Sequence, residues 1–243
     1  MFSPRGPSLR ELATQALSSV EGGYDRLAPK FDHTPFRTHD AILGATTTAL
    51  RRLGPFGPGL DVCCGTGAGR TVLAAVCPGP ITGVDFSAGM LAQARRADPG
   101  PGPGLGATWV RADARELPFR AAFGLAVSFG ALGHFQPAER PALFAGVYRA
   151  LRPGGLFAVP LAAPPPIRSR GYWALLGFDL AMRARNTLWR PPFVMYYRTG
   201  PWPAVRADLA AAGFAVTLVP LPELGQRPDG SPRYGLALAR KPG

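Results

Sequence analysis

The chain has 243 residues, 47% of them hydrophobic, which is enough for one α/β domain with a sizeable core and excludes a disordered chain. No apolar run is long enough to span a bilayer, and residues 1–20 lack the apolar core of a secretory signal. The formal net charge of +12 comes from basic residues spread along the whole chain, without a basic stripe or recognition motif, and this disfavours a nucleic-acid partner.

Residues 59–161 alternate short β-rich runs with helical stretches. The pattern predicts five strands, at residues 59–64, 81–86, 107–113, 125–130 and 156–161. Between them it predicts a surface loop at 98–106 and helices at 69–76, 88–97 (capped by Ser87) and 137–151 (opened by Pro137). Repeated βα units of this size predict a parallel sheet with helices on both faces.

The two ends of the chain differ from this repeat. Residues 1–58 are expected to form one or two helices before the first strand. Residues 202–214 predict a last helix, and residues 215–221 and 234–240 predict two further strands. The link between these two strands is too short for a helix, so we expect them to pair in an antiparallel manner. The predicted fold is α/β, with a seven-stranded, mostly parallel sheet.

The stretch DVCCGTGAGR, residues 61–70, joins an acidic residue and two cysteines to a glycine-rich turn. A phosphate loop requires Lys and Ser/Thr after its glycines, whereas Gly69 is followed by Arg70 and Thr71. Adjacent cysteines lack the chelating spacing of a metal site, so no metal is expected. A nicotinamide-binding turn requires a third glycine where Arg70 stands, and it has no need for Asp61.

Three carboxylates at successive strand ends fit a different ligand. Asp61 precedes the turn and can receive an ammonium group, while Asp85, 20 residues beyond Gly65, can accept both hydroxyls of a ribose. Asp113 ends the third predicted strand and can accept a hydrogen bond from an adenine amino group. All three fall at the carboxyl edge of the sheet, where open α/β sheets bind ligands. An ammonium, a ribose and an adenine are together the features of S-adenosyl-L-methionine.

Six stretches follow one another in an order known from one enzyme family. They cover residues 24 to about 161 and read YDRLAPKFD (24–32), LDVCCGTG (60–67), GVDFSAGML (83–91), RADARELPF (111–119), VSFGALGHF (127–135) and RALRPGGLF (149–157). In these stretches the chain resembles the class I S-adenosylmethionine-dependent methyltransferases, most of all the small-molecule branch that includes the ubiquinone/menaquinone-biosynthesis C-methyltransferases. The resemblance implies a Rossmann-like fold and methyl transfer to a small, apolar or aromatic acceptor.

The resemblance also implies which residues bind the methyl donor. They are Tyr24, Asp61, Cys63, Gly65, Gly67, Asp85, Phe86, Met90, Asp113, Ala114, Ser128 and Phe129. Two positions depart from the family, which usually has Gly where Cys63 stands and commonly Asp where Gly124 stands. Paired cysteines recur in the quinone branch. Gly124 is expected at the sheet edge away from the ligand, so its effect should be on local packing.

Methyl transfer by direct displacement needs alignment of the reacting groups and exclusion of water, but no metal. A phenol or an acidic carbon as acceptor also needs a base. His134 is the best candidate, although a single loop histidine more often has no chemical role. His33 and His39 are weaker candidates. An RNA methyltransferase and a non-catalytic S-adenosylmethionine-binding protein remain as alternatives.

Residues 164–203 interrupt the sheet with eight of the 24 aromatic side chains of the chain, Tyr197 among them. A helix over residues 172–190 places Trp173, Leu176, Leu180, Ala184 and Leu188 on one face and Leu175, Phe178, Met182 and Trp189 on the other. A helix that is apolar on two sides is expected to bury both. We expect a lid that roofs an apolar acceptor pocket together with residues 24–43. The alternative to a lid is that the insertion forms extra core or a dimer interface. Three arginines are expected at the rim of the pocket or at an anionic membrane surface: Arg183, Arg185 and Arg190.

These expectations combine into a single methyltransferase domain with four parts. The parts are an N-terminal helical cap (1–58), a donor-binding core (59–163), the lid-like insertion (164–203) and a C-terminal helix with a strand pair (204–243). The three cysteines, Cys63, Cys64 and Cys77, are typical of a reducing compartment. We therefore expect a cytoplasmic monomer or homodimer that acts on a small molecule, with room for peripheral membrane contact.

Overall fold

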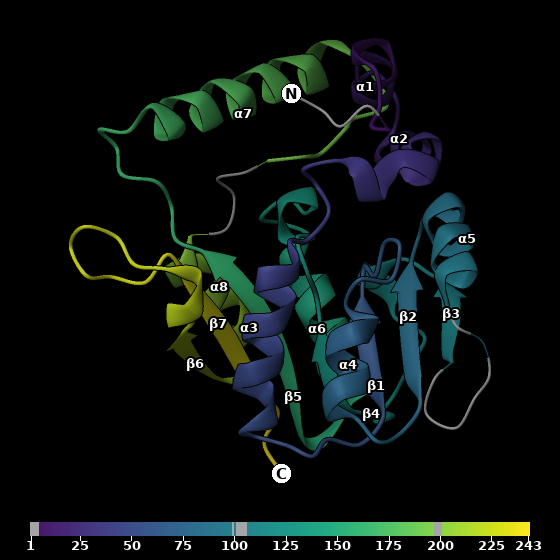
Figure 1. Cartoon of the computed structure of the whole chain (residues 1–243), viewed down its shortest axis with the longest axis vertical. Helices are drawn as coiled ribbons and strands as arrows, with labels where there is room; N and C mark the ends of the chain where they lie inside the picture. The colour runs from purple at the N-terminus through teal and green to yellow at the C-terminus, as the bar shows by residue number, and fades with distance from the viewer. Residues whose placement is uncertain (1–4, 99, 101–105, 197–200) are drawn as a thin grey trace.

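A seven-stranded sheet forms the centre of the computed structural model, which describes residues 5–98, 100, 106–196 and 201–243 (Figure 1). The strand order is β3-β2-β1-β4-β5-β7-β6, and β7 runs antiparallel to both of its neighbours while the remaining pairs are parallel. This arrangement confirms the predicted Rossmann-like α/β fold and its antiparallel last pair. The strands are β1 (Gly59–Val62), β2 (Ile81–Asp85), β3 (Ala107–Arg111), β4 (Phe123–Val127), β5 (Leu151–Ala162), β6 (Ala215–Pro220) and β7 (Tyr234–Arg240).

Helices cover both faces of the sheet, because each presents an apolar stripe that must be buried. One core cluster joins the sheet to α6 (Arg140–Ala150) and α8 (Trp202–Ala211), and the other joins it to α3 (Asp40–Arg51) and α4 (Arg70–Val76). Helix α5 (Ala88–Ala97) begins after Ser87, whose hydroxyl accepts a hydrogen bond from the Met90 amide as predicted for this cap. Short 3-10 helices add η2 (Ala114–Glu116), η3 (Leu132–His134) and η4 (Pro222–Leu224).

Several element boundaries differ from the prediction. β4 ends at Val127 rather than at residue 130, so the residues that follow belong to the loop at the carboxyl edge. α6 begins at Arg140 and has Pro141, not Pro137, in its first turn. β5 begins at Leu151, where the end of a helix was expected, because this buried side chain pairs with Phe123 of β4 ahead of a register shift.

The N-terminal region contains more helix than the one or two segments predicted. Helices α1 (Leu9–Ala16) and α2 (Val20–Leu27) and the 3-10 helix η1 (Ala28–His33) precede α3. Ser8 forms a capping box at α1, and Ser19 caps α2. Each of these α-helices has only eight residues, so hydrophobic periodicity alone does not separate them.

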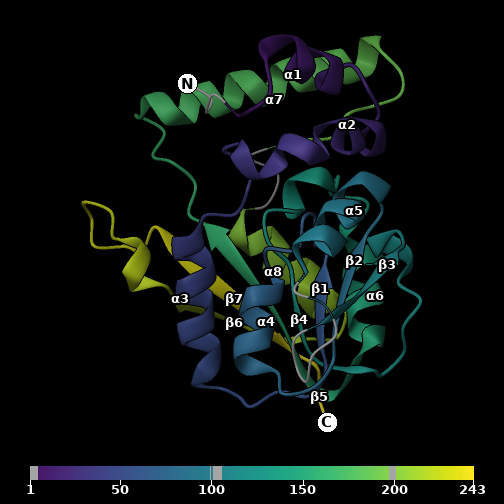
Figure 2. The same ribbon diagram turned by 45° about the vertical axis from the view of Figure 1, so that its right-hand side comes forward.

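The insertion contains α7 (Arg170–Leu188), which lies with α1 and α2 beyond the carboxyl edge of the sheet (Figures 1 and 2). The helix expected over residues 172–190 is therefore confirmed. Its inward side packs through Phe178 and Met182 on residues 193–196. The prediction that both sides are buried is wrong, because the opposite side of α7 is exposed. The contacts that α7 makes to residues 193–196 and to Ser18 are not on this exposed side. Trp189, expected on the same face as Phe178 and Met182, follows the end of the helix and is exposed as well.

Two predictions fall on parts of the chain that the structure does not describe. Most of the loop expected at 98–106 and the aromatic residue Tyr197 lie outside the described residues. Among the residues that are described, no helix combines the length and the hydropathy needed to cross a membrane.

Candidate functional site

The glycine-rich turn after β1 opens the candidate site. Its backbone is left-handed at Cys63 (φ 57°), Gly65 (φ 54°) and Gly67 (φ 93°). A Cβ on Gly67 would lie 2.7 Å from the Trp109 ring, and a Cβ on Gly69 would lie 2.5 Å from a carboxylate oxygen of Asp61. A Cβ on Gly65, in contrast, would have no described heavy atom within 4 Å apart from its chain neighbours. The turn is therefore closely packed on its inner side and open above Gly65, as close approach of a ligand to the backbone requires.

Asp61 lies buried beneath this turn, with 1% of its surface exposed. Its carboxylate accepts a hydrogen bond from the Gly69 amide, while its Oδ2 atom has no hydrogen-bond partner among the described residues. Burial and the neighbouring charge of Asp85 raise the pKa of Asp61 to about 8. An unsatisfied buried carboxylate oxygen is costly, and a cationic group would satisfy it.

Asp85 ends β2 and connects its strand to the glycine turn. Its Oδ2 atom accepts a hydrogen bond from the Gly65 amide at 2.9 Å, and its Oδ1 atom accepts one from the Ser87 amide at 2.9 Å. Burial raises the pKa of this carboxyl group, and the backbone amides oppose that shift. The carboxylate is thus held in a fixed position at the strand end, and each oxygen retains a lone pair for a further donor.

Asp113 differs from its expected role in a specific way. It lies two residues beyond the end of β3 and caps η2, accepting from the Arg115 amide at 2.8 Å. The Arg115 guanidinium also donates to both carboxylate oxygens, at 3.0 Å from Nε and 2.6 Å from Nη2, and it lowers the pKa of Asp113. Contact with an adenine amino group would therefore require Asp113 to share its oxygens with Arg115.

The remaining predicted donor-binding side chains lie around these strand ends. Met90, Ala114 and Ser128 are buried, and Ala114 belongs to the sheet core. Phe86 is half-buried at the end of β2. Phe129 packs against the core cluster that contains α3 and α4. Direct contact of these five side chains with the donor stays a prediction.

Tyr24 and His134 form a hydrogen-bonded pair across 110 positions of the sequence. The distance from the Tyr24 hydroxyl to His134 Nε2 is 2.8 Å, and His134 Nδ1 lies 2.8 Å from the Val194 carbonyl oxygen. Because a carbonyl oxygen can only accept, Nδ1 carries the proton and Nε2 accepts from the tyrosine. Burial lowers the pKa of His134, which keeps the ring neutral. Sequence reasoning chose both residues but missed their pairing, which depends on where residues 193–196 fold back.

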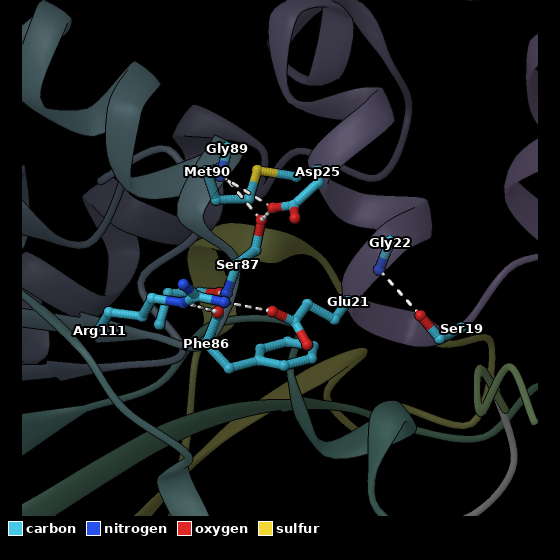
Figure 3. Close-up of polar contacts among 10 residues, drawn as sticks. Ser19, Glu21, Gly22, Asp25, Phe86, Ser87, Gly89, Met90 and Arg111 are labelled. Carbon is cyan, nitrogen blue, oxygen red and sulfur yellow. Dashed lines mark hydrogen bonds and ion pairs between the residues drawn. The ribbon is translucent and has the colours of Figure 1, made fainter. Parts of the chain in front are cut away.

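Helix α2 holds Tyr24 in this position through two contacts with the sheet domain (Figure 3). Asp25 Oδ1 accepts from the Ser87 hydroxyl at 2.6 Å and from the Gly89 amide at 2.8 Å. Glu21 pairs with Arg111 Nη2 at 2.5 Å, and Arg111 Nε donates to the Phe86 carbonyl. These contacts place α2 directly over the start of α5.

A third contact joins the N-terminal region to the glycine turn itself. The Thr66 hydroxyl donates to Asp32 Oδ1 at 2.7 Å, so η1 lies against the turn. The two other histidines do not share this site's hydrogen bonds: His33 is exposed at the end of η1, and His39 caps α3.

The structure also explains the missing aspartate at Gly124. A Cβ at this position would lie 2.8 Å from the Gly57 backbone nitrogen, because the loop before β1 crosses the start of β4 there. Gly124 lies at the amino end of β4, away from the candidate site, as predicted. Its effect is on local packing.

Comparisons with known proteins point to one family. Residues 60–155 match the family model described as a methyltransferase domain. An uncharacterized methyltransferase of Synechocystis is 33% identical over 133 residues, covering 54% of this chain and 58% of that protein. The demethylmenaquinone methyltransferase of Lactiplantibacillus plantarum is 32% identical over 160 residues, covering 59% of this chain and 62% of that protein.

The match to these two curated relatives thus spans about three fifths of their length. Among solved structures, human N-acetylserotonin methyltransferase in complex with S-adenosylmethionine superposes with a TM-score of 0.61 at 18% identity, covering 98% of this chain and 60% of that one. At that identity the likeness concerns the fold. The family model and the strand order agree with each other: residues 60–155 resemble a methyltransferase domain, and the sheet around them has the Rossmann-like fold.

Proposed function

We propose that this protein transfers a methyl group from S-adenosylmethionine to a small, apolar or aromatic acceptor by direct displacement. The observation that carries the proposal is the unsatisfied Asp61 Oδ2 atom beneath an open glycine turn, where the nearby charge of Asp85 helps to raise the pKa of Asp61. These features fit a ligand that brings an ammonium group and a hydroxylated ribose to the carboxyl edge of the sheet.

The residues divide the work of donor binding. Asp61 would hold the ammonium group, while Asp85 and the backbone at Gly65 would hold the ribose. The donor supplies an electrophilic methyl group on a positively charged sulfur. The aromatic face of Tyr24 suits such a cation. The role of Asp113 in this set requires that it share its carboxylate with Arg115.

An apolar acceptor fits the surroundings of the Tyr24–His134 pair. The inward side of α7, residues 193–196 and Tyr24 form one cluster of apolar and aromatic side chains, built from Phe178, Met182, Phe193, Val194 and Tyr196. The names of two related proteins, demethylmenaquinone methyltransferase and N-acetylserotonin methyltransferase, both describe small acceptors. We place the acceptor under the insertion, with the N-terminal cap and the insertion as its roof.

Acceptors with an acidic O–H or C–H group must also lose a proton. Since Nδ1 of His134 donates to Val194, the basic nitrogen Nε2 faces the Tyr24 hydroxyl rather than open space. The pair can therefore act as one base: the tyrosine oxygen takes the proton from the acceptor while its own proton passes to Nε2. His134 alone would be the catalytic base only after Tyr24 moves away.

The proposal is tested by incubating small-molecule extracts with the protein and methyl-labelled S-adenosylmethionine, followed by mass spectrometry. We expect a labelled small product together with S-adenosylhomocysteine. A parallel incubation with total RNA separates the alternatives. Label in RNA would favour an RNA methyltransferase, and donor binding without turnover on any acceptor would favour a non-catalytic binder.

A further inference from the structure

The outward face of α7 carries exposed apolar side chains along the length of the helix. Trp173 is 59% exposed, Leu180 57% and Leu188 86%. At about 100° per residue, these three side chains point within about 80° of one another. The positions between them on the same face are small and exposed as well: Gly177, Ala181 and Ala184. These six residues are called the outward face below.

Positive charge surrounds the outward face, and negative charge is absent from it. The one acidic residue of α7, Asp179, is buried on another side of the helix. Exposed arginines flank both ends of the helix, in each case next to an exposed apolar residue: Arg168 follows Ile167, and Arg190 follows Trp189. A further arginine, Arg183, borders the face and lies over the Tyr196 ring.

This charge pattern decides between the partners that could cover such a face. In a symmetric dimer the same face would meet its own copy, so arginines would approach arginines without a carboxylate between them. An anionic lipid surface supplies the complementary charge, and tryptophan and arginine side chains suit the boundary between lipid headgroups and acyl chains. The helix is not apolar enough to cross the bilayer, so it would lie in the plane of the surface.

We propose that the outward face of α7 docks on the surface of an anionic lipid bilayer. Both views place α7, together with α1, at the outer limit of the molecule, beyond the carboxyl edge of the sheet (Figures 1 and 2). Docking there requires no change in the packing of Phe178 and Met182 on the inward side. If the proposed function is also correct, the bilayer lies on the same side of the molecule as the acceptor site, which suits a lipid-soluble acceptor.

The test is flotation of the full chain with lipid vesicles. The vesicles contain phosphatidylcholine and phosphatidylglycerol at about two to one, with pure phosphatidylcholine as the neutral reference. We expect the protein to float with the anionic vesicles only, and to be released at high ionic strength because screening weakens the arginine contacts. The double substitution Leu180→Glu with Leu188→Glu is expected to reduce the bound fraction about tenfold or more.

A matched control is Leu53→Glu, since Leu53 is an exposed leucine that follows α3 at the opposite end of the molecule. It should float like the parent, and circular dichroism should show all three proteins folded. The proposal is overturned if the parent does not float with anionic vesicles. It is also overturned if Leu53→Glu weakens flotation as much as the double substitution in α7 does. It is also overturned if the parent is a dimer that the α7 substitutions dissociate while flotation is unchanged, because a second copy then covers the face.

Discussion

Cys63 occupies a backbone conformation that ordinarily belongs to glycine. Its φ of 57° is left-handed, and a residue with a Cβ pays roughly 1–2 kcal/mol for that conformation. This accounts in physical terms for the glycine that the family usually has here. Cys63→Gly should therefore raise the stability of the protein by about 1 kcal/mol, which corresponds to about 2–4 °C in the melting temperature of a chain of this size.

The matched control for this prediction is Ala68→Gly in the same turn. Ala68 is not among the left-handed non-glycine residues, so glycine relieves no strain there. Glycine only adds backbone freedom to the unfolded chain, so Ala68→Gly should lower the stability of the protein. Thermal unfolding of both variants measures the difference. A lower melting temperature for Cys63→Gly would mean that its side-chain contacts outweigh the backbone strain.

The Tyr24–His134 pair gives a second prediction at this scale. Tyr24→Phe keeps the ring but removes the hydroxyl that faces Nε2 of His134. If the pair acts as one base, turnover should fall by about 10²-fold or more while the affinity for S-adenosylhomocysteine changes little. His134→Gln should lower turnover to a similar extent, since it breaks the same relay. Full activity of Tyr24→Phe would show that the hydroxyl only positions the ring.

Among the elements, α2 depends on one close approach to α5. A Cβ on Gly89 would lie 2.9 Å from both the Cα and the carbonyl oxygen of Asp25. Gly89→Ala must therefore push α2 outward, breaking the contacts of Asp25 and moving Tyr24 away from His134. We expect a stability loss of about 1–3 kcal/mol, faster amide hydrogen exchange in α2 and reduced turnover.

Gly44→Ala is the control for that substitution. It also replaces a helical glycine, but a Cβ there meets nothing within 4 Å among the described residues. Alanine should raise stability by about 0.5–1 kcal/mol through its better helix propensity. If Gly89→Ala behaves in the same way, α2 is not held over the site by this contact.

For the whole molecule, the two sides of α7 should have separate functions. Replacing Phe178 and Met182 with Ala opens the cluster next to Tyr24, so it should raise the KM for the acceptor and leave donor affinity nearly unchanged. Replacing Trp173 and Leu180 with Ala alters exposed side chains, so stability should change by less than about 0.5 kcal/mol. Stability curves and steady-state kinetics of both variants distinguish the sides. If the Phe178 and Met182 variant loses stability but keeps the KM of the parent for the acceptor, the acceptor does not lie under the insertion.

The mostly parallel sheet, its antiparallel last pair and the positions of Asp61 and Asp85 could be predicted from the sequence, because βα repeats bring strand ends to one edge. The pairing of Asp113 with Arg115 could not, since two neighbouring residues of opposite charge give no signal of whether they contact each other or a ligand. The exposed side of α7 was missed for a related reason. Helical periodicity shows which residues share a face, but not whether another segment covers it.

The central claim is that S-adenosylmethionine binds at the carboxyl edge of the sheet, over Asp61 and Asp85. Titration calorimetry of the donor against the parent, Asp85→Ala and the exposed control Glu116→Ala tests it most directly. The account predicts that Asp85→Ala weakens binding by about 1–3 kcal/mol, because the ribose hydroxyls lose a charged acceptor, and that the control binds like the parent. Equal donor affinity in the parent and in Asp85→Ala, or no binding to the parent at all, would contradict it.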